Sequence, residues 1–186
     1  LAQDGNGGGA IYSEARSRLQ LYGSRFVCNN SRAFLTTYEG GAIFMQDSYG
    51  SIDSCYFAGS PVFNQQGGAV RAINGGARLT ISILNTIFTD NTARQGSAVY
   101  MEDNLDCNIV NSLIFANTTT GGFGDGGSIN CDGSVNMYIS NSTIADNLST
   151  HASDGGGLAD DGSLNYEVYN SIIWNNQVSN VRSATI

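Results

Sequence analysis

The sequence predicts an all-β fold, a right-handed parallel β-helix (solenoid) of about six coils with three short strands per coil. Three observations support this prediction: a glycine-rich phrase that recurs about every thirty residues, a second phrase later in each interval, and alternating apolar and polar residues between them. Units of this length without a helical period cannot bury their own apolar sides, so they must stack on copies of themselves. We therefore expect residues 1–186 to form a single β-helix domain.

The first phrase, Gly-Gly-Ala followed by an aliphatic residue, anchors each repeat. It is complete at 8–11, 40–43 and 67–70, and degenerate copies begin near 96, 126 and 156. Small residues suit a chain that turns sharply, because they avoid β-carbon clashes or accept positive φ. The aliphatic ends of the phrase should stack into one internal column, formed by Ile11, Ile43, Val70, Val99 and Ile129.

The second phrase reads Asn-Ser/Thr-x-apolar-x-x-Asn. It recurs at 85–91, 111–117, 141–147 and 170–176, with blurred copies at 23–29 and 53–59. The closing Asn residues are predicted to tolerate left-handed φ at a corner and to hydrogen-bond to the backbone or to the next Asn. Sugar binding by these asparagines is the functional alternative. The apolar positions predict a second internal column, formed by Phe26, Tyr56, Phe88, Ile114, Ile144 and Ile173.

A short alternating stretch separates the two phrases, as at 79–83, 135–139 and 164–168. Alternation over about five residues is the period of a strand with one buried face. Each repeat therefore supplies three short strands. Coils spaced at about 4.8 Å would give a rod roughly 25–30 Å long for six repeats.

The charge pattern excludes some partners. The chain has eight arginines and no lysine against sixteen carboxylates, with a formal charge of −8. A nucleic-acid binder needs a clustered basic face, whereas these arginines are scattered singly, so nucleic acid is not expected as a partner. No apolar run approaches the length of a membrane span, so membrane insertion is not expected. The first residues lack signal-peptide features and are typical of a processed or trimmed end.

The four cysteines, Cys28, Cys55, Cys107 and Cys131, lack the C-x-x-C spacing of zinc or thioredoxin chemistry. We expect buried thiols. One or two disulfides remain an alternative, since Cys28 and Cys55 are about one repeat apart and could lie on adjacent coils.

Catalytic groups are scarce. The one histidine, His151, lies near Ser153 and Asp154 and is expected at the surface. Asp160 and Asp161 resemble the double Asp of polygalacturonase-type β-helices, but the accompanying Gly-His-Gly and Arg-Ile-Lys are missing, so a polar corner is preferred. Residues 102–106 could bind calcium weakly, but without EF-hand or RTX spacing a solvated turn is preferred. We predict no catalytic, cofactor-binding or metal-binding residue, and no cofactor.

Two further features concern the surface. Asn-x-Ser/Thr acceptors for glycosylation occur at Asn29, Asn117, Asn141 and Asn147. The loops at 118–125 and 148–155 are predicted to leave equivalent corners of neighbouring coils and to form one contact patch.

The pairing of Gly-Gly-Ala-Ile/Val with Phe-x-x-Asn, as at 26–29 and 88–91, resembles the polymorphic outer-membrane-protein type of repeat. The resemblance covers nearly the whole chain. Such repeats occur in passenger domains of bacterial autotransporter adhesins and in secreted bacterial β-helix proteins. The resemblance implies an extracellular or cell-surface rod that is adhesive or serves as a scaffold.

We therefore expect a non-catalytic structural or adhesive protein that is secreted or displayed at the cell surface. Its partner would be either a surface glycan or protein, or a second copy of itself. Open strand edges without an evident helical cap predict either end-to-end strand pairing into an extracellular filament or continuation of the same rod in a longer protein, and the sequence does not separate the two. The alternative is a polysaccharide-binding or polysaccharide-cleaving β-helix enzyme, a lyase or glycoside hydrolase.

Overall fold

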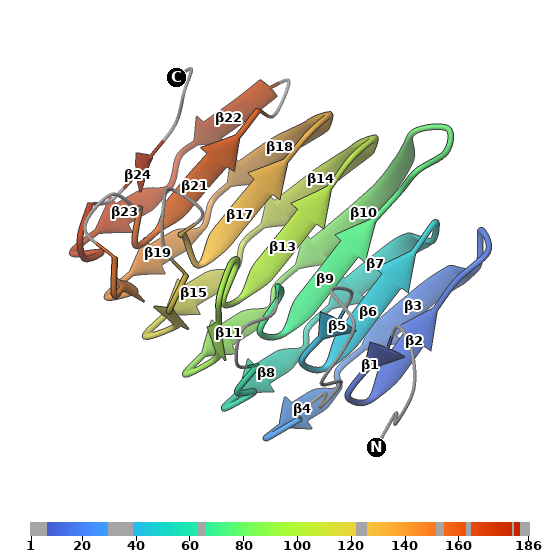
Figure 1. The fold of residues 1–186 in the computed structure, drawn as a ribbon, viewed down its shortest axis with the longest axis horizontal. Helices are drawn as coiled ribbons and strands as arrows, with labels where there is room; N and C mark the ends of the chain where they lie inside the picture. The colour runs from blue at the N-terminus through green and yellow to red at the C-terminus, as the bar shows by residue number, and fades with distance from the viewer. Residues whose placement is uncertain are drawn as a thin grey trace.

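The chain forms a parallel β-solenoid in the computed structural model, which describes residues 7–29, 39–62, 66–121, 126–151, 155–162, 165–179 and 181–182. Within these residues the regular elements are all β-strands, and every long sheet is parallel. Figure 1 shows the chain passing through the same sheets in each coil, from the blue N-terminal end to the red C-terminal end. The predicted parallel β-helix with three strands per coil is confirmed. No helix in the described part of the chain is long and apolar enough to span a membrane.

Sheet I is built by the strands that follow the glycine-rich phrase. Its strands, in order across the sheet, are β2 (Ile11–Ser13), β6 (Ile43–Gln46), β9 (Val70–Ile73), β13 (Val99–Glu102), β17 (Ile129–Asp132), β21 (Leu158–Asp161) and β24 (Val181–Arg182). A small pair, β1 (Gly7–Gly8) and β5 (Glu39–Gly40), precedes its first two strands.

Sheets II and III hold the alternating stretch and the Asn phrase. Sheet II consists of β3 (Arg18–Tyr22), β7 (Tyr49–Asp53), β10 (Leu79–Leu84), β14 (Leu105–Val110), β18 (Val135–Ser140) and β22 (Asn165–Tyr169). Sheet III consists of β4 (Arg25–Val27), β8 (Tyr56–Ala58), β11 (Ile87–Thr89), β15 (Leu113–Phe115), β19 (Thr143–Ala145) and β23 (Ile172–Trp174). A short sheet follows sheet III and holds β12 (Thr92–Ala93), β16 (Thr118–Thr119) and β20 (Leu148–Ser149). Sheets II and III are each six strands deep, close to the predicted six coils.

The first internal column lies where the sequence predicts it. Ile11, Ile43, Val70, Val99 and Ile129 are register partners on successive strands, and Leu158 extends the column. Leu158 pairs with Ile129, so the sixth glycine phrase begins at 155, one residue before the predicted position. Burying these side chains against one another gives roughly 1.5–3 kcal/mol each relative to exposure, so the column is a main source of coil-to-coil cohesion.

The second internal column contains Phe57, and its prediction with Tyr56 is wrong. Phe26, Phe57 and Phe88 are register partners whose rings stack with centroids 4.7 and 4.9 Å apart. The repeat at 53–59 is therefore displaced by one residue. Phe57 is wholly apolar and fills the interior, while Tyr56 points outward under the Arg25 guanidinium at 4.7 Å and keeps its hydroxyl near water.

At the corners, positive φ and side-chain hydrogen bonding belong to different residues, whereas the sequence assigns both to the closing Asn. Positive φ occurs at the opening Asn residues, such as Asn85 and Asn111, and at the residue before the closing Asn, such as Asp90. The closing Asn residues do not have positive φ, so that part of the prediction is wrong. Their predicted side-chain ladder is confirmed, because Nδ2 of each donates to Oδ1 of the next along the series Asn91, Asn117, Asn147 and Asn176, at 2.9, 3.0 and 2.8 Å.

Close packing explains the small residues in the glycine phrase. A β-carbon at Gly41 would lie 1.8 Å from the Gly68 carbonyl oxygen, and one at Gly68 would lie 2.0 Å from that of Ser97. Any larger residue would push neighbouring coils apart at this corner, so the phrase is a steric requirement of the stack.

Candidate functional site

The two aspartates that resemble a glycosidase pair point to opposite faces of strand β21. Asp160 pairs with Cys131 and is buried, whereas Asp161 pairs with Asp132 and is exposed. Successive residues of a strand alternate between faces, so the two carboxyl groups lie on different sides of the sheet. They therefore cannot flank one glycosidic bond as the two carboxyl groups of a glycosidase do.

The acidic stretch 102–106 is divided among separate partners. Glu102 Oε2 lies 2.6 Å from Arg71 Nη2, and Asp106 Oδ1 accepts bonds from Arg78 Nη1 at 3.0 Å and Asn136 Nδ2 at 2.7 Å. Asp103 and Asn104 form the turn between them with positive φ. Among the described residues there is no group of three or more His, Cys, Asp or Glu side chains suited to hold a metal ion.

The cysteines are free thiols, and three of them are buried. Cys28 is exposed and faces Gly59 on the next coil, so it does not stack on Cys55. Burial raises the pKa of Cys55, raises that of Cys107 to about 12, and raises that of Cys131 well above its ordinary value. A raised pKa removes the thiolate, so these three buried thiols are poor nucleophiles in the folded chain.

The remaining predicted surface features separate into two groups. Asn117 and Asn147 belong to the buried ladder, so the folded chain cannot present them for glycosylation, while Asn141 is exposed. Strands β16 and β20 pair, which places the two predicted contact loops at equivalent corners of neighbouring coils. The tips of those loops at 122–125 and 152–154, and with them Ser153 and Asp154 beside His151, lie outside the described residues.

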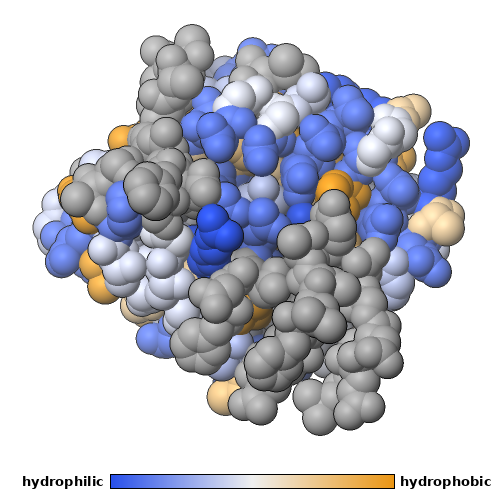
Figure 2. Space-filling view, viewed as in Figure 1, coloured by the Kyte–Doolittle hydropathy of each residue, from blue (hydrophilic) through white to orange (hydrophobic). Residues whose placement is uncertain are grey.

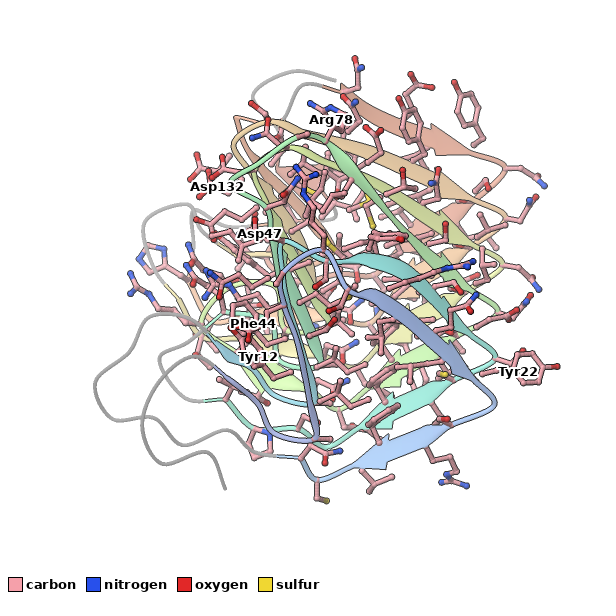
Figure 3. The ribbon with its side chains drawn as sticks, turned by 90° about the vertical axis from the view of Figure 1, so that its right-hand side faces the viewer. Tyr12, Tyr22, Phe44, Asp47, Arg78 and Asp132 are labelled. Atoms are coloured by element: carbon pink, nitrogen blue, oxygen red, sulfur yellow. The ribbon has the colours of Figure 1, made fainter. Side chains whose placement is uncertain are left out.

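A cluster that the sequence reading missed lies on the outer side of sheet I. The outward register partners Phe44, Arg71 and Tyr100 are almost fully buried, and Arg71 is only 1% exposed. The Arg71 guanidinium lies between two rings, 5.6 Å from Phe44 and 5.3 Å from Tyr100, and forms the ion pair with Glu102. In Figure 3, Tyr12, Phe44 and Asp132 lie on the same side of the molecule, away from Tyr22.

The electrostatics of this cluster follow from burial. Burial raises the pKa of Tyr100, so the phenol is neutral and donates to Asp132 Oδ2 at 3.2 Å. Burial also raises the pKa of Asp132, and the Tyr100 hydrogen bond opposes that shift. Glu102 balances the charge of Arg71, and the Phe44 and Tyr100 rings lie over its guanidinium group. Arg71 therefore joins three neighbouring coils. The signal for it was available in the repeat alignment, where Phe, Arg and Tyr occupy the position after the aliphatic residue.

Two shallow hollows are lined by described residues, and charged or polar side chains contribute to both. One, of about 540 Å³, is lined by Arg16, Asp47 and Asn74 with nearby small residues at the corner between sheets I and II. The other, of about 320 Å³, lies on the outer face of sheet II among Arg18, Tyr49 and Thr80. The face drawn in Figure 2 is mostly hydrophilic where it is coloured.

Sheet III has a different outer face, made largely of apolar side chains. The middle residue of each strand points inward and its two neighbours point outward, as the burial patterns of β8, β15 and β19 show. The outward residues form two columns. The first column runs Arg25, Tyr56, Ile87, Leu113, Thr143 and Ile172, and the second runs Val27, Ala58, Thr89, Phe115, Ala145 and Trp174.

The two ends of the solenoid carry opposite charge. The described N-terminal residues 7–29 hold three exposed arginines, at positions 16, 18 and 25, against one carboxylate, Glu14. The described residues at the other end, 155–162, 165–179 and 181–182, hold three carboxylates, Asp160, Asp161 and Glu167, against one arginine, Arg182. The described part of the first coil therefore has an excess of basic residues, and that of the last coil an excess of acidic ones.

Comparisons of the chain with protein-family models, with curated proteins and with solved structures find no match. The resemblance to polymorphic outer-membrane-protein repeats therefore stays a prediction. Function has to be inferred from the residues and contacts of the chain itself.

Proposed function

We propose that this chain is a non-catalytic structural and adhesive β-helix of a secreted or cell-surface protein, and that copies of it stack end to end. The observation that carries the proposal is the complementarity of the two solenoid ends, in backbone hydrogen bonding and in charge. The occupant of each end is a second copy of the same chain.

Backbone groups at the N-terminal end are directed outward in a regular pattern. Tyr49 donates its N–H to the Ser17 carbonyl at 3.1 Å, and Gly23 donates to the Asp53 carbonyl at 3.0 Å, so odd-numbered residues around β3 face β7. Alternate residues of a strand direct their backbone groups to opposite sides, so Arg18, Gln20 and Tyr22 direct theirs to the side of β3 where the described residues place no further strand of sheet II. An open edge of this kind is a template for another strand.

The C-terminal end presents the matching edge. Asn141 donates its N–H to the Tyr169 carbonyl at 3.1 Å, so the odd-numbered residues of β22 face β18. Tyr166 and Val168 then direct their backbone groups outward. Among the described strands of sheet II, β3 is the first and β22 the last, so a further copy would continue the same parallel ladder.

The side chains favour the head-to-tail orientation. If the register columns of sheet II continue into the next copy, Gln20 of one copy is the register partner of Glu167 of the other. Arg18 lies two residues before Gln20 on β3, with its side chain on the same outer face. Opposite charges on facing ends attract at low ionic strength and orient the encounter, and salt screens them over about 10 Å at 0.1 M. Head-to-head contact would bring arginines together.

The test is light scattering and negative-stain electron microscopy of the chain over a concentration series. We expect thin filaments or a mass that rises with concentration, and less assembly at high salt. Gln20→Pro should abolish assembly because it removes an outward N–H, while the matched Gln20→Ala should not. Particles of one chain's mass at every concentration and salt would contradict the proposal.

A charge swap separates specific stacking from aggregation. Glu167→Arg should weaken assembly, and adding Arg18→Glu to the same chain should restore it, because the facing charges are then opposite again. If the double variant assembles no better than Glu167→Arg, the proposed orientation is wrong.

A further inference from the structure

We propose that the outer face of sheet III binds an uncharged polysaccharide chain. This inference deepens the adhesive part of the proposed function by naming its partner, and it does not depend on end-to-end stacking. Three features of the face carry it: an apolar floor with aromatic rings, a border of carboxamide groups, and a size that suits a linear polymer better than a protein.

The floor is exposed most at its C-terminal end. Ile172 is 61% and Trp174 63% exposed, and Phe115 is partly exposed in the same column as Trp174. Phe115 and Trp174 are separated by two strand spacings, about 10 Å, with the small Ala145 between them. That spacing is close to the length of one disaccharide unit, so successive sugar faces of an extended polymer can stack on the two rings.

Hydrogen-bonding groups run along both edges of the floor. At the corner with sheet II, Asn111 Nδ2 donates to Asn85 Oδ1 at 2.7 Å, and Asn170 Nδ2 donates to Asn141 Oδ1 at 2.6 Å, on exposed side chains. At the other edge, Asn175 Nδ2 donates to Asp146 Oδ1 at 2.6 Å. These amides are held in rows by one another, and sugar hydroxyls can bond to their remaining donors and acceptors.

The size of the face argues against a folded protein as its occupant. Three residues across six strands cover roughly 300 Å², because residues rise about 3.3 Å along a strand and strands lie about 4.8 Å apart. A stable protein interface needs about 800 Å² on each partner. A second copy docked here would be held too weakly to persist.

The charge of the face selects among polysaccharides. Within the two outward columns the one charged side chain is Arg25, at the N-terminal end and already above the Tyr56 ring. Asp90 and Asp146 lie along one edge and Asp53 on the other. An anionic polymer would be repelled along most of its length, so the ligand is uncharged.

The test is affinity electrophoresis of the native chain in gels containing hydroxyethyl cellulose or galactomannan, with alginate as the anionic comparison. We expect retardation by at least one neutral polymer and none by alginate. Trp174 is the only tryptophan, so its fluorescence, titrated with the retarding polymer, reports on the proposed face directly. We expect its emission to shift to shorter wavelength as the ring is covered.

Variants locate the site. Trp174→Ala and Phe115→Ala should each weaken retardation about tenfold, as truncating an aromatic anchor does. Tyr49→Ala is the matched control, because Tyr49 is 37% exposed but lies on β7, inside sheet II and away from the ends. Thermal unfolding of each variant shows whether the fold is kept, and the exposed Trp174 should be replaceable without loss of stability.

Three results would overturn the inference: no retardation by either neutral polymer, retardation that Trp174→Ala leaves unchanged, or a loss of mass in light scattering on Phe115→Ala without polysaccharide, since Phe115 lies on β15, away from both ends of sheet III. The last result would make the face a protein interface. Light scattering measures the mass that stacking changes, and electrophoresis measures polysaccharide binding. Either proposal can therefore fail without the other.

Discussion

Replacing Asn117 with alanine tests whether the internal Asn ladder holds the coils together. Asn117 is 0% exposed. Its Nδ2 donates to the Phe88 carbonyl at 3.1 Å and to Asn147 Oδ1 at 3.0 Å, and its Oδ1 accepts from the Asn91 backbone N–H at 3.1 Å and Asn91 Nδ2 at 2.9 Å. Alanine leaves these groups, on the two coils that flank Asn117, without this partner.

The expected loss is large for a single polar residue. A buried donor or acceptor left unsatisfied costs about 1–3 kcal/mol, and Asn117→Ala exposes several groups to that penalty. Because neighbouring side chains can relax, we expect the free energy of unfolding to fall by about 3–5 kcal/mol. The matched control is Asn141→Gly, which removes an exposed Asn at a corner whose φ of 52° glycine accepts, and should change stability by less than about 1 kcal/mol.

Urea unfolding followed by far-ultraviolet circular dichroism measures both variants. Tryptophan fluorescence of Trp174, on the last strand of sheet III, reports whether the terminal coil unfolds with the rest. Repeat arrays can lose cooperativity, so the two probes should be compared before a single free energy is assigned. If Asn117→Ala costs no more than Asn141→Gly, the ladder does not stabilise the stack and the reasoning is refuted.

Three more outcomes follow from the described contacts. Phe57→Ala should lower the free energy of unfolding by about 3–5 kcal/mol and Tyr56→Ala by less than about 1.5 kcal/mol, measured by the same urea titration; equal losses would contradict the corrected register. A thiol reagent should label Cys28 in the native chain and the buried cysteines only after unfolding, as mass spectrometry of digests can show; native labelling of Cys107 would contradict its burial. Because the pKa of Asp132 is raised in the folded chain, its contribution to folding stability is fully present below the ordinary aspartate pKa. That contribution is lost as the pH rises through the pKa of the folded state. Asp132→Asn should therefore stabilise the chain at pH 7, with a gain that vanishes in acid, and a pH-independent gain in unfolding midpoint would disprove this assignment.

The register of the repeats could be predicted wherever both phrases are intact. Ile11, Ile43 and Val70 are recognisable because the complete Gly-Gly-Ala phrase precedes each one. The prediction failed at Tyr56, where the flanking Asn residues are replaced and two adjacent aromatics compete for one interior position. Packing decided between them, since the interior column accepts a ring without a hydroxyl.

The repeats did not predict how the side chains on the outer faces of the sheets are arranged. Arg71 reads as a scattered surface charge in the sequence, yet it lies buried between Phe44 and Tyr100. The floor of sheet III was equally hidden, because Phe115 and Trp174 are two repeats apart and become neighbours in one column only through stacking.

The sequence by itself determined the period of the chain, its three strands per coil and the small residues at its corners, because these depend on local sterics and on alternation within a few residues. The tertiary structure decided which residues of different coils meet where the phrases are degenerate and on the outer faces of the sheets. Contacts between coils join residues about thirty positions apart, and a shift of one residue moves a side chain from the interior to the surface. The buried Arg71 cluster, the complementary ends and the proposed polysaccharide face all arise at that level.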